Sequence, residues 1–180
     1  MMIKSRRGQI WVETVIYTLI GLTLIGITLA FLTPKINETR DRSVIEQTIS
    51  SLQTMDGKIN EILRAPGNKR IVEFKMERGV IAFDGENDLI RYSLNDSQVI
   101  FSEPGIPVRL GKITVLTTEG QKTHSVVLTL DYNFDMTVNG EEGVLEFDSS
   151  PTPYSFSFEN KGFVDVDGTT LENIDVSEIG

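Results

Sequence analysis

The sequence contains no cysteine, which excludes disulfide bonds, thiolate metal sites and a cysteine nucleophile. Its single histidine, His124, excludes a multi-histidine metal site and leaves serine-type hydrolysis with only one candidate base. The 180 residues contain no Gly-x-Ser-x-Gly elbow and no glycine-rich phosphate loop. With 17 basic and 26 acidic residues, the net charge is −9, which disfavours contacts with nucleic-acid phosphates. We therefore expect no enzymatic activity, no cofactor, no metal and no nucleic-acid partner.

Charged residues are also missing from one long segment near the N-terminus. From Thr14 to Pro34, 21 consecutive positions carry no charge, and most of them are aliphatic. A helix of about 20 such residues crosses a hydrocarbon core about 30 Å thick, whereas the apolar region of a secretory signal has about 7–15 residues. The leader, residues 1–8, carries three basic residues and no acidic one, which places it in the cytoplasm. We predict a retained, single-pass membrane helix with the C-terminal part of the chain extracellular.

Glu13 stands at the beginning of this apolar segment. A carboxylate at that depth is costly, and it indicates a functional site because it needs a partner that a simple anchor does not supply. The alternative is that the side chain reaches back to the cytoplasmic headgroups, since Glu13 lies near the end of the span. The residues alone leave both interpretations open.

The segment from Lys4 to Glu13, KSRRGQIWVE, resembles the class III signal peptide of type IV pilins and archaellins. In that family a prepilin peptidase cuts after the glycine, the apolar helix stays on the mature protein, and glutamate is typically fifth after the cut. The resemblance implies a processing site formed by Arg7, Gly8 and Gln9, with Glu13 at the fifth position. The basic pair before the glycine and the glutamine after it look archaeal, because bacterial pilins usually have phenylalanine after the glycine.

The resemblance covers residues 4–34 and implies a structural function. The chain would be a subunit of a type IV pilus-like surface filament, or a minor or accessory subunit, used in adhesion or surface anchoring. The implied partners are prepilin peptidase, copies of this chain or other pilin-like subunits, and membrane lipid. Glu13 and Trp11 are the expected assembly residues, together with the helix face from Ile10 to Leu32. The amino group that cleavage creates on Gln9 would pair with Glu13 of its own or a neighbouring helix.

Two alternatives belong to other classes of protein. An uncleaved, signal-anchored extracellular binding module has the same topology but no need of Glu13. An archaellum accessory protein of the stator type combines a pilin-like N-terminus with an external β-sandwich. Glu13→Gln separates the pilin from the simple anchor, because it should impair assembly of the pilin and leave the anchor functional.

Apolar residues continue at helical spacing beyond Pro34. Seven of them form one stripe of an amphipathic helix expected over residues 35–66, namely Ile45, Ile49, Leu52, Met55, Ile59, Ile62 and Leu63. Pro34 is expected to kink the helix or break it where it leaves the bilayer, and residues 9–64 could form one long, bent helix. The stripe is expected to pack on a domain or on other helices, and the alternative is a parallel dimeric coiled coil. In a filament, where helices bundle, the two are not exclusive.

Residues 67–180 have the alternating pattern of short β-strands. They predict an extracellular antiparallel domain, sandwich-like or packed on the outer helix, so the expected fold class is α+β. Turn residues at 119–121, 139–143 and 160–162 predict three hairpins. Residues 172–180 are expected to form a frayed acidic tail.

Acidic loops and sequons are the remaining candidate sites. In the loop that begins at Asp165, the sixth position is Thr170, whereas an EF-hand needs glycine there, so we expect a plain turn. The loop 84–88 has the same interpretation. Asn95 and Asn37 begin Asn-x-Ser/Thr sequons and are candidate glycosylation sites, with Asn95 favoured because it lies in a predicted turn.

Overall fold

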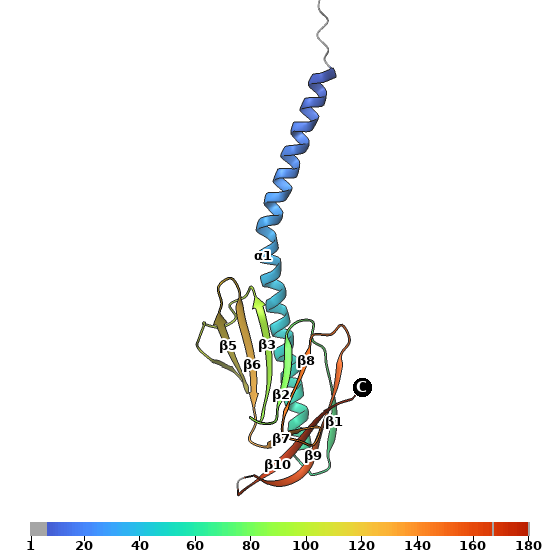
Figure 1. Cartoon of the computed structure of the whole chain (residues 1–180), viewed down its shortest axis with the longest axis vertical. Helices are drawn as coiled ribbons and strands as arrows, with labels where there is room; N and C mark the ends of the chain where they lie inside the picture. Colours follow the sequence, from blue (N-terminus) through green and yellow to red (C-terminus); the bar gives the residue numbers. More distant parts are fainter. Residues whose placement is uncertain (1–6, 167, 180) are drawn as a thin grey trace, which may run out of the picture. The chain divides into compact units, whose positions relative to one another are not determined.

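One helix dominates the N-terminal part of the chain. The computed structural model describes residues 7–166 and 168–179, with side chains from residue 11 onward. Helix α1 (Arg7–Ile62) has 56 residues and continues through Pro34, so the prediction of one long helix is confirmed and the alternative of a break at this proline is wrong. Figure 1 shows α1 as one helical ribbon. The chain divides within α1 into two compact units, which meet between Thr39 and Arg40.

The first unit is the apolar part of α1. It belongs to the one described helix that is long and apolar enough to cross a membrane, and its most apolar window is not buried in the protein. Four threonine hydroxyls in this part each donate to the carbonyl four residues earlier at 2.8 Å; they belong to Thr18, Thr23, Thr28 and Thr33. The helix thus supplies partners for these polar groups internally, as a lipid environment demands. These features fit single-pass membrane anchoring.

The second unit contains the rest of α1 and a β-rich domain of two sheets. All neighbouring strands are antiparallel except the parallel pair β7 and β10. The four-stranded sheet has the order β1 (Lys69–Phe74), β9 (Tyr154–Val166), β10 (Thr169–Glu178), β7 (Asp135–Val138). The six-stranded sheet has the order β4 (Val108–Leu110), β5 (Ile113–Glu119), β6 (His124–Asp131), β3 (Leu89–Ser97), β2 (Val80–Asp84), β8 (Val144–Asp148).

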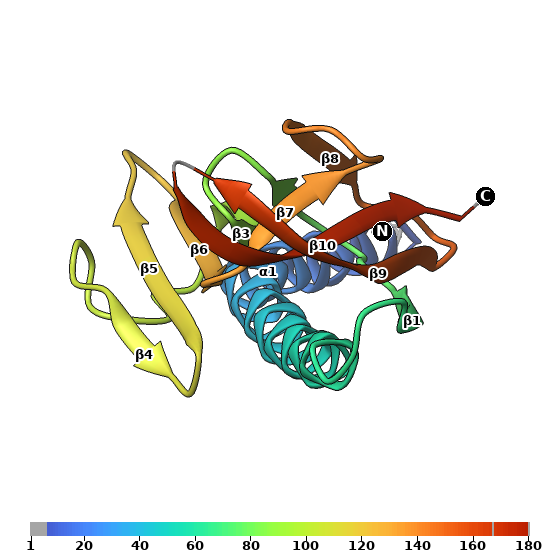
Figure 2. The same cartoon turned by 90° about the horizontal axis from the view of Figure 1, so that it is seen from below.

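The predicted apolar stripe of α1 forms part of the core of this unit. Five of its seven residues have no exposed surface, and the other two, Ile49 and Leu63, are partly buried against the core. Side chains from both sheets belong to the same core cluster, and Figure 2 shows strands of both sheets beside α1. Burial of each such aliphatic side chain contributes about 1.5–3 kcal/mol. Because the chain's own sheets cover the stripe, it is not free to form the seam of a coiled coil.

One of the three predicted hairpins is confirmed and a second is wrong. Strands β5 and β6 pair around the predicted turn at 119–121, with Glu119 opposite His124. The turn at 139–143 also forms, since the Val138 N–H donates to the Glu141 carbonyl at 2.8 Å. However, β7 pairs with β10 and β8 pairs with β2, so the two strands beside this turn belong to different sheets. Turn residues predict a change of direction, but they do not select the pairing partner.

The third predicted hairpin, at 160–162, is also wrong. Strand β9 continues through these residues, and Lys161 is the extra residue of a β-bulge opposite β10. The buried Asn160 directs its side-chain Nδ2 to the Ile62 carbonyl at 3.1 Å, and its Oδ1 accepts the Gly162 N–H at 2.8 Å. Gly162 has a φ of 97°, which favours glycine. The Asn-Lys-Gly segment therefore holds the C-terminal end of α1 against the sheet.

The C-terminal segment is not a frayed tail. Residues 172–178 are part of β10, where Ile174 and Val176 have no exposed surface. These residues alternate with polar ones, among them Asp175 and Ser177, which are less buried. The prediction was wrong because it followed the acidic charge of the segment rather than its period of two.

Candidate processing and assembly site

The predicted processing residues lie at the beginning of α1. Arg7, Gly8 and Gln9 belong to its first turns. The side chains of residues 7–10 and all of residues 1–6 lie outside the described part of the chain, so the predicted cleavage position is described as helical backbone only.

Glu13 is exposed and has a hydrogen-bond donor on its own helix. The Tyr17 hydroxyl donates to Glu13 Oε1 at 3.3 Å, which the four-residue spacing permits because i and i+4 share one face. An ionised carboxylate has about four acceptor positions, so this hydrogen bond leaves capacity for a cation. Tyr17 was not among the residues predicted from the sequence, although its spacing from Glu13 was a usable signal.

Trp11, the second predicted assembly residue, is 70% exposed. It lies two residues before Glu13, and residues at that spacing point to different faces of a helix. The structure therefore does not bring the two predicted assembly residues together. Trp11 contributes exposed aromatic surface near the beginning of the apolar segment, a position that suits the membrane interface.

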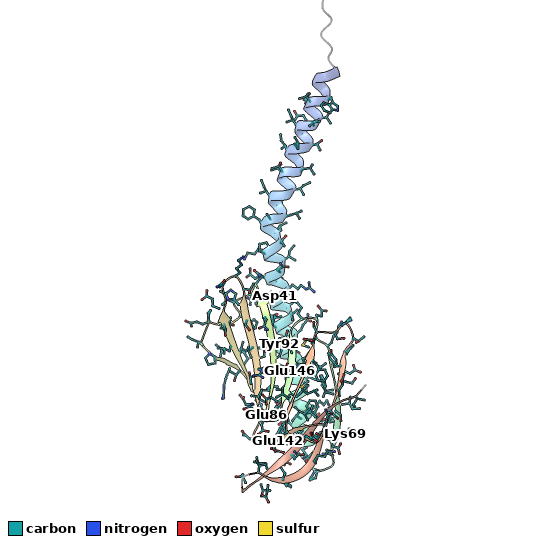
Figure 3. The ribbon with its side chains drawn as sticks, viewed as in Figure 1. Asp41, Lys69, Glu86, Tyr92, Glu142 and Glu146 are labelled. Atoms are coloured by element: carbon teal, nitrogen blue, oxygen red, sulfur yellow. The ribbon has the colours of Figure 1, made fainter. Side chains whose placement is uncertain are left out.

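A buried carboxylate joins α1 to two segments of the β-rich domain. Asp41 is 1% exposed; its Oδ1 pairs with Arg78 Nη1, and its Oδ2 accepts the Gln98 N–H at 2.8 Å. Arg78 is held in turn by its carbonyl, which accepts the Tyr92 hydroxyl at 2.7 Å, and burial raises the pKa of Tyr92 to about 12. Figure 3 labels Asp41 on α1 and Tyr92 within the domain. Asp41 lies four residues before Ile45 and therefore on the same face of α1 as the apolar stripe. An acidic residue on this buried face was an overlooked signal of a polar contact.

A second polar contact holds the same helix farther along. Lys112 Nζ donates to Asp56 Oδ1 at 3.0 Å and lies 4.2 Å from the centroid of the Tyr132 ring. The Tyr132 ring stacks on Phe134, with centroids 4.6 Å apart. At a partly exposed site, a cation over an aromatic face and an ion pair each contribute modestly to the stability of the fold. Together with the Asp41 contact, they fix the helix relative to the six-stranded sheet.

The acidic loops have the hydrogen bonding of turns. Asp84 Oδ1 accepts the Asn87 N–H at 3.0 Å, and Asp88 Oδ1 accepts the Met136 N–H at 2.7 Å. In the other loop, the Thr170 hydroxyl donates to Asp165 Oδ1 at 2.9 Å. Within residues 11–166 and 168–179, no three acidic or histidine side chains are arranged to hold a metal ion. Asp84, Asp88 and Asp165 thus have structural partners within their own turns or in β7.

Asp88→Asn is expected to stabilise the second unit at neutral pH. Burial, followed by the nearby Asp135, Glu142 and Asp84, raises the pKa of Asp88, so its ionisation disfavours the folded state. The contribution of this group to stability is greatest below the unfolded-state pKa near 3.9 and falls as pH rises through the folded-state pKa. Asparagine keeps the acceptor for Met136 and tolerates the positive φ of 53°.

Urea unfolding of the full chain in detergent tests this expectation. The midpoint for Asp88→Asn should exceed that of the original chain at pH 7, and the difference should shrink towards pH 3.5. The exposed Asp131→Asn is the matched control. A lower midpoint for Asp88→Asn at pH 7 would show that the charge of Asp88 is stabilising.

The two predicted glycosylation sites have different surroundings. The predicted turn at Asn95 is wrong, because Asn95 lies within β3, in the irregular segment between Leu94 and Ser97. Its side chain is exposed, and its Oδ1 accepts the Ser125 hydroxyl at 2.8 Å. The serine of this sequon, Ser97, is fully buried and its hydroxyl oxygen accepts the Val99 N–H at 3.1 Å. Asn37 is exposed within α1. In the folded protein each asparagine is accessible, but the hydroxyl of the Asn95 sequon is not.

Comparisons of the chain with protein-family models, with curated proteins and with solved structures find no match.

Proposed function

We propose that this chain is a structural subunit of a type IV pilus-like surface filament, cleaved by a prepilin peptidase after Gly8. The observation that carries the proposal is the apolar part of α1, which the protein leaves unburied and which begins with a glycine and a glutamate five residues apart. Before assembly, membrane lipid would cover this surface. In a filament, the same surface on neighbouring subunits would cover it instead.

The charge of Glu13 explains why a glutamate would stand five residues after Gly8. Cleavage would create an α-amino group on Gln9, whose charge complements the carboxylate. In surroundings of low dielectric constant, an unpaired carboxylate is strongly penalised and an opposite charge is strongly attracted. Tyr17 supports the proposal because it supplies one hydrogen bond and leaves room for the amino group. A pair between neighbouring subunits would set their relative position along the filament.

The proposed topology has the leader in the cytoplasm and the β-rich unit outside an archaeal cell. The basic leader supports this orientation. Residues 40–180 contain 13 basic and 24 acidic residues, and a net charge of −11 favours solubility of an exposed domain. Adhesion or surface anchoring would then be the task of this domain.

Replacement of Gly8 by tryptophan is expected to block processing. A bulky side chain next to the cleaved bond would prevent the close approach of the peptidase to the backbone. Intact mass of the membrane-extracted variant should include residues 1–8. Gly57→Trp is the matched control, because Gly57 is exposed and a Cβ added there meets no atom within 4 Å, and it should be trimmed normally. Normal trimming of Gly8→Trp would contradict the proposed cleavage site.

A further inference from the structure

An open pocket lies on the second unit where its part of α1 begins. It has a volume of about 430 Å³ and is lined by α1, by the segment after β1 and by the loop after β8; the residues are Arg40, Lys75, Glu77, Ser149, Ser150 and Pro151. The Ser150 N–H donates to the Met76 carbonyl at 3.1 Å. This hydrogen bond fixes the loop to the segment that carries Lys75 and Glu77, so two walls of the pocket are held together.

The two cations of this pocket, Arg40 and Lys75, are exposed. Neither Arg40 nor Lys75 takes part in any ion pair among the side chains that the structure describes. Nearby Arg78 is different, since it pairs with the buried Asp41. Glu77 is the one carboxylate among the lining residues, so the lining has a net charge of +1. A positive pocket stands out on a unit whose net charge is −11.

Three side chains of the pocket, those of Arg40, Lys75 and Ser149, are donors suited to an anion. A guanidinium offers a planar fork of N–H groups that matches two phosphate oxygens, and an ammonium adds a compact positive charge. The hydroxyl of Ser149 is a further donor at the same wall. The Ser150 and Thr152 hydroxyls lie 3.0 Å apart and bond to each other, so they stabilise the loop. These donors and positive charges favour the binding of a phosphodiester. A pocket lined by carboxylates or by apolar side chains would bind a phosphodiester less well.

The position of Arg40 in the sequence indicates where the phosphate comes from. Arg40 follows Thr33, near the end of the uncharged segment, by seven residues, which is about 10 Å of helix. The headgroup layer adds about 5–8 Å on each side of the hydrocarbon core, and helical side chains lean towards the N-terminus. We propose that this pocket binds the phosphate of an anionic phospholipid headgroup. The proposal rests on the membrane span and is independent of filament assembly.

Native mass spectrometry of the full chain in detergent tests this site. The chain is titrated separately with phosphatidylglycerol, phosphatidylcholine and inorganic phosphate. Each cation near an anionic lipid contributes about 1 kcal/mol, or about fivefold in affinity. The double variant Arg40→Gln/Lys75→Gln should therefore bind phosphatidylglycerol at least about tenfold more weakly. Hydrogen exchange of residues 73–79 and 147–152 should slow with the lipid in the original chain and not in this variant.

A second double variant, Arg109→Gln/Lys122→Gln, is the matched control. It removes the same two charges from exposed positions of the second unit that do not line the pocket. It should retain its affinity for phosphatidylglycerol within about twofold. Equal weakening in both double variants would show general attraction and overturn the pocket. Equal affinity for phosphatidylglycerol and phosphatidylcholine would also overturn the proposed binding of an anionic headgroup. If inorganic phosphate binds as tightly as phosphatidylglycerol, the proposal that the phosphate belongs to a lipid is overturned.

Discussion

Glu13→Gln is expected to remove the chain from sheared filaments while cleavage after Gly8 and membrane insertion stay normal. Glutamine keeps the size of the side chain but not its charge, so the amino group of Gln9 on a neighbouring helix loses its partner. Loss of one partner of a buried ion pair costs about 3–5 kcal/mol. Such a cost at every subunit contact should reduce the filament fraction by more than about 100-fold.

Quantitative immunoblots of filament and membrane fractions measure this effect. Tyr17→Phe is the matched control, since it removes only the hydroxyl that donates to Glu13. We expect a smaller loss of filaments for this variant, because a hydrogen bond to a charged group contributes about 1.5–3 kcal/mol, less than the loss of one partner of a buried ion pair. If Glu13→Gln enters filaments at the original level, the pairing account fails. A chain that never enters filaments but keeps a surface function would favour the signal-anchored binding module.

Asp41→Ala is expected to lower the free energy of unfolding of the second unit by about 3 kcal/mol. The substitution leaves Arg78 without its carboxylate and the Gln98 N–H without its acceptor. The removal of one partner from a fully buried pair costs about 3–5 kcal/mol. The lower end applies here because the Arg78 side chain is 31% exposed and water can solvate part of its charge.

Urea unfolding of the full chain in detergent measures this loss. Asp131→Ala is the control, because Asp131 is exposed and surface substitutions usually change stability by less than about 0.5 kcal/mol. The double variant Asp41→Ala/Arg78→Ala should recover part of the loss, because no unpaired charge remains. Equal stability of Asp41→Ala and Asp131→Ala would mean that the buried pair does not hold α1 to the domain.

The features that the sequence predicted correctly depend on neighbouring residues. The stripe from Ile45 to Leu63 repeats at helical spacing, so both the helix and its buried face could be predicted. The β5–β6 hairpin was also local, because a short turn joins two strands that pair with each other. Pairing of β7 with β10 joins residues such as Asp135 and Asn173, and no local pattern contains that information. Asn160 illustrates a further limit, since the same residue types form turns and bulges.

In the candidate site, too, local features could be predicted from the sequence and contacts between distant residues could not. Gly8 and Glu13 are recognisable because their spacing lies within one segment of sequence. Tyr17 and Asp41 could have been found from helical spacing, but the partners of Asp41 could not. Arg78 and Gln98 are 37 and 57 residues away from it, and only the folded chain brings the three together. The pocket around Arg40 likewise combines segments that are distant in sequence.

The most direct test of the proposed function is the intact mass of the protein from its native membrane, measured in cells with and without prepilin peptidase. The account predicts the mass of residues 9–180 in the presence of the peptidase and the mass of residues 1–180 in its absence. A chain that retains residues 1–8 in both kinds of cell would contradict processing, and with it the assignment to a pilin-like filament.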